Sequence, residues 1–362
     1  MRFLFLEPFC GGSHRDFADG LAAHSRHDIH VETLPARFWK WRMRGAALHF
    51  AHTVTGLEDY DGIIAGSLMS LADFTALNRR RPPALVYFHE NQLTYPLAPG
   101  ERLDRQFGFT DINTALCAER ILFNSRYHHE RFFEALPEFI GRMPEFKPHW
   151  ATAAIRRKAA VLYPGCRFTA APLAPDPLPA GPPLVIWNHR WEFDKGPDVF
   201  FEALDQAARR GAEFRLAVLG ENYRSRPHVF LDAAERFGDR IVQFGYLEDR
   251  ADYTRWLRQG FVVVSTAQQE NFGIAVIEAM RHGCLPLLPR RLAYPEILPR
   301  EFHADFLYGD TDDLVDKLTA LLRHPERYVH HRPVLADMMA RHAWTRVVER
   351  YDRELERLAS RG

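Results

Sequence analysis

The chain has 362 residues, of which 46% are hydrophobic and 26% are charged, so it is too long for one compact core and too apolar for a disordered protein. Its 47 Lys and Arg residues balance its 47 Asp and Glu residues. The zero net charge excludes nucleic-acid binding by bulk electrostatics, so any contact with RNA must come from a local basic patch.

Short apolar runs alternate with helical segments along the first half of the chain. The predicted strands span residues 2–6, 30–34, 61–65, 84–88 and 120–123. A glycine turn at Gly11 and Gly12 separates the first strand from a predicted helix at 16–23, and another helix is predicted at 68–77. Strand, glycine turn and helix form the opening unit of a nucleotide-binding domain. The alternation predicts a parallel sheet covered on both faces.

Prolines crowd residues 166–183, which excludes a helix or a central strand there and indicates a linker between domains. A second alternating pattern follows. Its predicted strands span residues 184–188, 214–219, 241–244, 261–265 and 285–288. We therefore predict an α/β protein with two Rossmann-like domains, at residues 1–165 and 184–344. The amphipathic C-terminal helix at 345–362 is expected to pack back on the first domain.

The second half contains two glutamates eight residues apart, Glu270 and Glu278, with Gly273 between them. Gly273 permits a tight turn, and a helix is predicted to start near Ile274. Its N-terminus offers free N–H groups to a diphosphate, while Glu278 and Glu270 offer acceptors to ribose and sugar hydroxyls. Alternatively, a glutamate early in a helix only caps it or complements its dipole.

Two cations follow the strand at 184–188. Arg190 offers a planar fork and Lys195 a compact charge to phosphate oxygens, unless both are solvated surface cations. Both motifs lie at strand C-termini of one domain, where ligands bind in open parallel sheets.

The segments HRWEFDKGPDVFFEAL and ENFGIAVIEAMRHGCLPLL resemble the donor-binding signatures of retaining glycosyltransferase family four, including its E-x7-E motif. The resemblance implies the GT-B fold, with two Rossmann-like domains facing a central cleft, and a metal-independent reaction. It also places Gly220 and Glu221 beside the nucleotide, and Tyr246 and Leu247 along its base. The implied donor-binding residues are Gly11, Gly12, Arg190, Lys195, Gly220, Tyr246, Leu247, Glu270, Asn271, Phe272, Gly273, Ile274 and Glu278.

The first half is similar to a narrower family. EPFCGGSHRDFADGL, ARFWKWRMRGAALHFA, YFHENQLTYPL and FGFTDINTALCAERILFNS resemble segments of the tRNA-queuosine α-mannosyltransferases. This resemblance implies transfer of mannose from GDP-mannose to queuosine in the anticodon of tRNA-Asp. His89, at a strand end, would face the donor sugar, or it only caps the strand. The implied catalytic residues are His89, Glu270, Arg190 and Lys195.

An RNA acceptor agrees with one local feature. Arg37, Lys40, Arg42 and Arg44 interleave with Phe38, Trp39 and Trp41, so cations could hold phosphates while rings stack on bases, unless the rings belong to the core. The expected acceptor-binding residues are Ser13, His14, Lys40, Arg42, Glu90, Asn91 and Gln92.

We expect no metal site, because the four cysteines form no CxxC pair and His128-His129 and His330-His331 lack ligand spacing, which indicates surface residues. Scattered cysteines and the absence of a signal-peptide pattern favour a cytoplasmic protein without membrane contact. The sequence does not give the oligomeric state, for which we expect a monomer. Two other functions remain open: a glycosyltransferase of this fold acting on a lipid, polysaccharide or small acceptor, and a non-catalytic protein that binds nucleotide-sugar or RNA.

Overall fold

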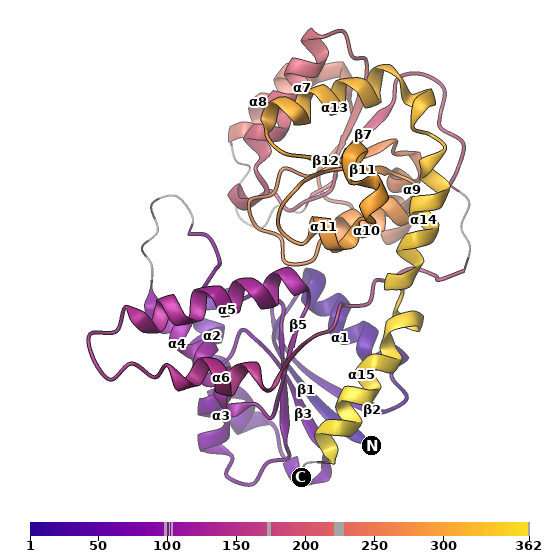
Figure 1. Cartoon of the computed structure of the whole chain (residues 1–362). Coiled ribbons are helices and arrows are strands. Elements are labelled where there is room, and N and C mark those ends of the chain that lie inside the picture. Colours follow the sequence, from indigo (N-terminus) through magenta and orange to yellow (C-terminus); the bar gives the residue numbers. More distant parts are fainter. Residues whose placement is uncertain (98–99, 101, 103, 172–174, 221–227, 361–362) are drawn as a thin grey trace. The chain divides into compact units, whose positions relative to one another are not determined.

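The computed structural model describes residues 1–97, 100, 102, 104–171, 175–220 and 228–360 (Figure 1). They form two compact units. Unit 1 comprises Met1–Thr169 and His342–Gly362, and unit 2 comprises Ala170–Arg341. The division falls inside the proline-rich segment 166–183. Each unit contains one six-stranded sheet in which every strand pair is parallel, as the α/β fold class predicts.

Unit 1 has the strand order β2-β1-β3-β4-β5-β6. Its strands are β1 (Arg2–Cys10), β2 (Asp28–Pro35), β3 (Gly62–Gly66), β4 (Ala84–Phe88), β5 (Arg120–Phe123) and β6 (Ala159–Val161). Its helices are α1 (Gly12–His24), α2 (Trp39–Thr53), α3 (Leu71–Leu77), α4 (Arg105–Cys117), α5 (Arg126–Gly141), α6 (Trp150–Arg156) and α15 (Trp344–Ala359).

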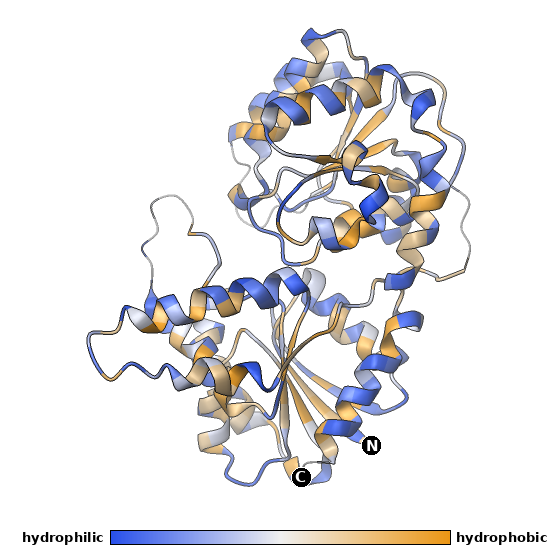
Figure 2. Cartoon of the chain, viewed as in Figure 1, coloured by the Kyte–Doolittle hydropathy of each residue, from blue (hydrophilic) through white to orange (hydrophobic). Residues whose placement is uncertain are grey.

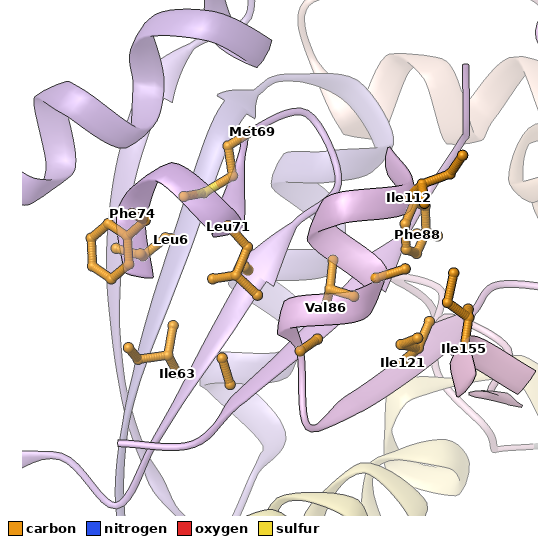
Figure 3. Close-up of a cluster of buried hydrophobic side chains, with 14 of the residues drawn as sticks. Leu6, Ile63, Met69, Leu71, Phe74, Val86, Phe88, Ile112, Ile121 and Ile155 are labelled. Atoms are coloured by element: carbon orange, nitrogen blue, oxygen red, sulfur yellow. The ribbon is translucent and has the colours of Figure 1, made fainter. Parts of the chain in front are cut away.

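The sheet of unit 1 has a hydrophobic cluster on each face, because successive side chains of a strand point to opposite sides. Leu4 and Val86 belong to the cluster under α2 to α6, part of which Figure 3 shows. Their strand neighbours Phe5 and Tyr87 belong to the cluster under α1 and α15. Strands β3 and β4 are buried along their whole length, so they lack the alternation of a half-exposed strand.

Helix α15 packs on unit 1 through Trp344, which is fully buried among Phe17, Tyr351 and their neighbours. Two glycines make room for its indole ring. A Cβ at Gly20 would lie 1.9 Å from Trp344 Nε1, and one at Gly165 would lie 2.2 Å from Trp344 Cδ2. In Figure 2 this helix carries both hydrophilic and hydrophobic stretches, as expected for a helix with one buried face.

Unit 2 has the strand order β12-β11-β10-β7-β8-β9. Its strands are β7 (Leu184–Trp187), β8 (Arg215–Val218), β9 (Ile241–Phe244), β10 (Val262–Val264), β11 (Leu285–Pro289) and β12 (Leu307–Tyr308). Its helices are α7 (Pro197–Arg209), α8 (His228–Phe237), α9 (Arg250–Gln259), α10 (Ile274–Arg281), α11 (Tyr294–Ile297), α12 (His303–Phe306), α13 (Thr311–Arg323) and α14 (His331–Met339). In the part of the chain that the structure describes, no helix has the length and apolar character needed to cross a membrane.

Several details differ from the sequence-based expectation, among them strand β1, which continues to Cys10 instead of ending at residue 6. Helix α1 begins at Gly12, four residues early, so Ser13 and His14 lie in its first turn. Helix α2 was not expected, because hydrophobic and cationic residues alternate around its first turns and show no helical period. The edge strands β6 and β12 were also missed, since three and two residues are too few to show a periodicity.

Candidate active site

The loops after β7 and β10 meet in unit 2. The chain proceeds from β7 to β8 on one side, whereas β10 lies on the other side of β7, so this is the topological switch point where open parallel sheets bind ligands. Hydrogen bonds join the two loops: Thr266 Oγ1 donates to the carbonyl oxygens of Lys195 (3.0 Å) and Gly196 (2.9 Å). A Cβ at Gly196 would lie 2.5 Å from the carbonyl oxygen of Thr266, so this close approach requires glycine.

Lys195 places a buried positive charge between the two loops of this switch point. Its buried Nζ donates to the carbonyl oxygen of Gln269 (2.7 Å) and lies 3.0 Å from Asp194 Oδ2 and 3.7 Å from Glu270 Oε2. The ammonium group is therefore held by the neighbouring loop, and its 3.7 Å separation from Glu270 is too long for a hydrogen bond.

Arg190 and Gly220 lie beside the same loop. Arg190 is exposed and pairs with Glu192 at 3.3 Å. His189 is buried, and burial together with the Lys195 charge lowers its pKa to about 3, so the ring is neutral at neutral pH. A Cβ at Gly220 would lie 1.7 Å from the carbonyl oxygen of His189, so the ends of β7 and β8 approach too closely for any side chain there. Glu221 lies outside the described residues.

The turn before α10 has the form that the sequence indicates. Gly273 has a φ of +100°, and the helix starts at Ile274. Glu270 Oε1 accepts a hydrogen bond from the backbone N–H of Phe272 at 3.3 Å. Asn271 is buried and accepts a hydrogen bond from Gln269 Nε2 at 3.0 Å. The structure thus brings the Glu270 turn and Lys195 together at a helix N-terminus suited to an anion.

Glu278 is buried on α10 and already has partners on α9. One carboxylate oxygen pairs with Arg250, and the other accepts a hydrogen bond from the Tyr253 hydroxyl at 3.4 Å. Asn188 Nδ2 donates to the same hydroxyl (2.9 Å) and to the carbonyl oxygen of Ala275 (2.8 Å). This network orients the carboxylate.

Tyr246 and Leu247 lie apart from this centre. They follow the edge strand β9, which β8 separates from β7, and Tyr246 is exposed. They are therefore placed beside the switch point rather than at it. Gly245 before them has a φ of +116°, which turns the chain at the strand end.

In unit 1, His14 joins two carboxylates. Its Nδ1–H donates to Glu7 Oε1 and its Nε2–H donates to Glu90 Oε2, both at 3.2 Å. Burial lowers the pKa of His14, but the charges of Glu90 and Glu7 outweigh it and raise the pKa to about 10. An imidazolium has two donors, so the two contacts fit a protonated ring. Glu7 is fully buried and Glu90 is partly exposed, so the network presents one carboxylate to a ligand.

His89 stacks on His14, with ring centroids 4.0 Å apart. Burial and the positive charge of His14 hold the pKa of His89 well below its usual value, so His89 is neutral at neutral pH. Its carbonyl oxygen accepts a hydrogen bond from Asn124 Nδ2 (2.8 Å), and Asn124 Oδ1 accepts one from His128 Nδ1 (2.8 Å). His128 is fully buried, so its interpretation as a surface residue was wrong.

Glu7, His14 and His89 also have ligand atoms within 4.8 Å of one another, which raises the question of a metal. Two observations speak against it. Both ring nitrogens of His14 already face carboxylates, and the planes of the two rings are inclined by only 29° in a stack. Stacked rings direct their in-plane lone pairs along separate planes, so they do not converge on one ion. The arrangement favours an ion-pair network over a metal centre.

The remaining residues expected in unit 1 divide into two groups. Gly12 and Ser13 are exposed at the start of α1, next to His14. Asn91 is instead used inside its own turn, because its Oδ1 accepts from the N–H groups of Leu93 (3.0 Å) and Thr94 (3.1 Å). Gln92 is likewise used within unit 1, because its backbone N–H donates to Asp111 Oδ2 at 2.5 Å. At Gly11 a Cβ would lie 2.4 Å from Ala36 Cβ, so this position has no room for a side chain.

Lys40 and Arg42 lie at the first turn of α2. Lys40 is exposed, with its Nζ 5.5 Å from the ring centroid of Trp39. Arg42 is half-buried and donates from Nε (3.3 Å) and Nη2 (3.2 Å) to the carbonyl oxygen of Pro35. Arg42 thus connects α2 to the end of β2. Its guanidinium group bonds to the protein's own backbone, whereas we expected it to extend toward the acceptor.

The residues of these networks that sequence reasoning missed include Glu7, His128, Arg250 and Tyr253. A carboxylate that ends the otherwise apolar run RFLFLE was the available signal for Glu7, because a buried charge needs a partner. The other three lie on helices, where spacing alone does not tell which side chains reach the strand ends.

Comparisons with known proteins agree with the two-unit structure. Residues 2–166 match the family model of the tRNA-queuosine alpha-mannosyltransferase N-terminal region, and residues 182–324 match the glycosyl transferases group 1 model. The tRNA-queuosine alpha-mannosyltransferase of Drosophila melanogaster is 36% identical over 343 residues, which cover 91% of this chain and 89% of that protein. A GDP-mannose:cellobiosyl-diphosphopolyprenol alpha-mannosyltransferase of Xanthomonas oryzae is 26% identical over 46% of this chain and 45% of its own length.

Solved structures support the fold. Sucrose-phosphate synthase from Thermosynechococcus elongatus superposes with a TM-score of 0.77 at 14% identity, covering 100% of both chains. A glycosyltransferase from Rickettsia africae superposes with a TM-score of 0.71 at 14% identity, covering 100% of this chain and 99% of that one. These likenesses show the GT-B fold. The identity to the insect protein along nearly the whole chain shows the family: this chain belongs to the tRNA-queuosine α-mannosyltransferases, a family of glycosyltransferases.

Proposed function

We propose that this glycosyltransferase transfers mannose from GDP-mannose to queuosine in the anticodon of tRNA-Asp, with retention at the anomeric carbon and without a divalent metal. The observation that carries the acceptor is the identity of 36% to the Drosophila melanogaster tRNA-queuosine alpha-mannosyltransferase along 91% of the chain. The match of residues 2–166 to the family's N-terminal model agrees with it. GDP-mannose is supported by the name of the Xanthomonas oryzae relative.

The switch point of unit 2 has the groups that such a donor needs. Lys195, the N-terminus of α10 and Arg190 would stabilise the departing diphosphate, which is the task that a divalent metal performs in other transferases. Glu270, 3.7 Å from Lys195 Nζ, would position the sugar through its hydroxyls. Glu278 would bind the ribose. In a front-face displacement the leaving phosphate oxygen takes the proton of the attacking hydroxyl, so no side chain needs to act as a base.

The network of unit 1 would receive the acceptor. Glu90 is held in place by the protonated His14 and is partly exposed, so its carboxylate would accept hydrogen bonds from the cyclopentenediol of queuosine. His89 is neutral, and a neutral imidazole would bind a sugar hydroxyl without adding charge near the reacting centre. A cytoplasmic location follows from a tRNA acceptor.

The test is sugar transfer from GDP-mannose to queuosine-containing tRNA, measured by mass spectrometry of the digested nucleosides. We expect a hexose-sized gain on queuosine with the wild-type enzyme, and its loss with Lys195→Ala. Queuosine-free tRNA is the acceptor control, and UDP-glucose is the donor control. Donor hydrolysis that depends on Lys195 without transfer to tRNA would contradict the acceptor while leaving the donor assignment intact.

A further inference from the structure

The segment around the start of α2 carries charges of one sign only, although the chain as a whole is neutral. Residues 34–57 contain four Lys or Arg residues and no Asp or Glu. They include Arg37 and Arg42, and the charge of Arg37 adds to burial in lowering the pKa of Arg42. Two guanidinium groups thus lie close enough to repel each other. A polyanion is the partner whose charge complements such a stretch.

The structure separates the three aromatic residues of this segment by burial. Trp39 packs against Phe107, with ring centroids 5.1 Å apart, and joins the small cluster of Met43 and its neighbours. Trp41 is 75% exposed and Phe38 is 59% exposed. The indole of Trp39 therefore packs in the core of unit 1, while the rings of Phe38 and Trp41 are exposed to solvent beside the cations. Core packing does not account for these two exposed aromatic residues.

The backbone at Phe38 supports a specific role for its ring. Phe38 has a φ of +56°, a left-handed conformation that is uncommon for a bulky residue. Its carbonyl oxygen caps the start of α2 by accepting from the N–H groups of Trp41 (2.8 Å) and Arg42 (3.1 Å). This turn joins the backbones of Phe38 and Trp41, which stand three positions apart at the first turn of α2.

The first turn of α2 is also connected to the network of unit 1, through Trp39. Trp39 and Phe9 pack against the same small cluster, and the ring of Phe9 meets that of His14 with centroids 5.8 Å apart. Since α2 starts directly after β2, its first turn lies at the same edge of the sheet as His14 and Glu90. If a nucleotide of the RNA is bound at Glu90, the nucleotides that flank it in the RNA chain would therefore lie along the surface of unit 1.

We propose that Phe38 and Trp41 form a stacking surface for unpaired bases of the acceptor RNA, with Arg37 binding an adjacent phosphate. The proposal rests on the tRNA acceptor proposed above and adds how the chain holds the nucleotides that flank the modified base. Aromatic stacking suits this task, because every base has a π face and the anticodon loop is single-stranded. An apolar protein partner is the competing occupant, and it would not require the cations.

The experiment measures kcat and KM for queuosine-containing tRNA with four variants: Trp41→Ala, Trp41→Leu, Trp41→Phe and Phe38→Asn. Asn tolerates the left-handed backbone of position 38, so that variant removes the ring and keeps the turn. Leu48→Ala is the matched control, because Leu48 is 61% exposed on the same helix, two turns beyond Trp41. Transfer to the free queuosine nucleoside, which has no flanking bases, is measured in parallel.

We expect Trp41→Ala and Phe38→Asn to raise KM for tRNA by roughly five- to a hundredfold each, as for the loss of one stacked base. Trp41→Leu should behave like Trp41→Ala, whereas Trp41→Phe should retain most of the affinity. Leu48→Ala and all reactions with the free nucleoside should be unchanged. Arg37→Gln should flatten the slope of log KM against log salt by about 0.7, as for one phosphate contact to a single strand.

The outcomes separate this proposal from the function on which it rests. A wild-type enzyme that modifies neither tRNA nor the nucleoside would overturn both. An active enzyme whose KM for tRNA is insensitive to Trp41→Ala and Phe38→Asn would overturn the stacking surface alone. Full activity of Trp41→Leu together with a loss in Leu48→Ala would show an apolar docking face, which also overturns it.

Discussion

The ring centroids of His14 and His89 lie 4.0 Å apart, and of these two stacked imidazoles one is cationic and the other neutral at neutral pH. Both are buried, and burial alone lowers the pKa of a histidine. His14 escapes this effect because Glu7 and Glu90 bind its two nitrogens, which raises its pKa to about 10. The resulting cation lowers the pKa of His89 further. One residue is therefore a fixed charge and the other a neutral hydrogen-bonding group.

The His14 cation predicts how stability depends on pH. The pKa of about 10 in the folded chain exceeds the ordinary value of 6.5, so the folded state keeps a proton that the unfolded state releases above pH 6.5. The stabilisation is complete below pH 6.5 and is lost as the pH rises toward 10. We expect the free energy of unfolding, measured with urea, to fall between pH 7 and 10 more steeply in wild type than in His14→Gln. An NMR titration that finds His14 deprotonating near pH 6.5 would contradict this assignment.

Lys195 should be the most sensitive position for catalysis. Removing a preorganised charge at the departing diphosphate costs roughly a hundred- to a thousandfold in kcat, so we expect a loss of that size in Lys195→Ala. The substitution also leaves Asp194 buried without its ion pair, 3.0 Å away in the wild type. The double variant Asp194→Asn/Lys195→Ala restores neutrality and should remain equally inactive. Arg209→Ala, an exposed cation at the last turn of α7, should keep wild-type rates.

Glu278 is expected to act on donor binding rather than on the chemical step. Glu278→Gln preserves the shape of the side chain but weakens its hydrogen bonds to a ribose, because charged acceptors form stronger ones. KM for GDP-mannose should rise roughly tenfold with little change in kcat, as expected for an interaction present in both ground and transition states. Glu202→Gln on the exposed face of α7 should change neither constant. A large fall in kcat with unchanged KM would exclude the ribose role.

Gly20 provides a test of how α15 is anchored. In most helices alanine is more favourable than glycine by about 0.5–1 kcal/mol. At Gly20, however, the added Cβ would lie 1.9 Å from Trp344 Nε1, so we expect Gly20→Ala to lower the free energy of unfolding by about 1–3 kcal/mol. Gly45→Ala on α2 is the matched control, because its Cβ would meet nothing within 4 Å, and it should be neutral or stabilising. Equal effects of the two substitutions in urea unfolding would refute the packing argument.

Much of the structure around Lys195 and Glu270 followed from local sequence. Strands β4, β5 and β9 have the predicted bounds, and α10 starts at the predicted Ile274. These features are local: a short, mostly apolar run of four or five residues marks a strand, and Gly273 marks the turn before the helix. Because parallel strands end at one edge of a sheet, the positions of Lys195 and Glu270 near each other could also be expected.

The acceptor side depended on contacts between distant segments. Glu7 and Glu90 are 83 positions apart, and only the sheet brings both to the ring of His14. The same holds for α2: spacing could not decide whether Trp39 or Trp41 was the core residue, because the answer depends on where Phe107 lies.

The sequence by itself determined the fold class, the longer strands of both sheets and the turn before α10, because each is encoded in the hydrophobic period and turn residues within a few positions. Only the tertiary structure decided which histidine carries the charge, which tryptophan is exposed and why Gly20 must lack a side chain. A pKa, an exposed fraction and a steric limit are all set by atoms from other segments, and those neighbours exist only once the chain has folded.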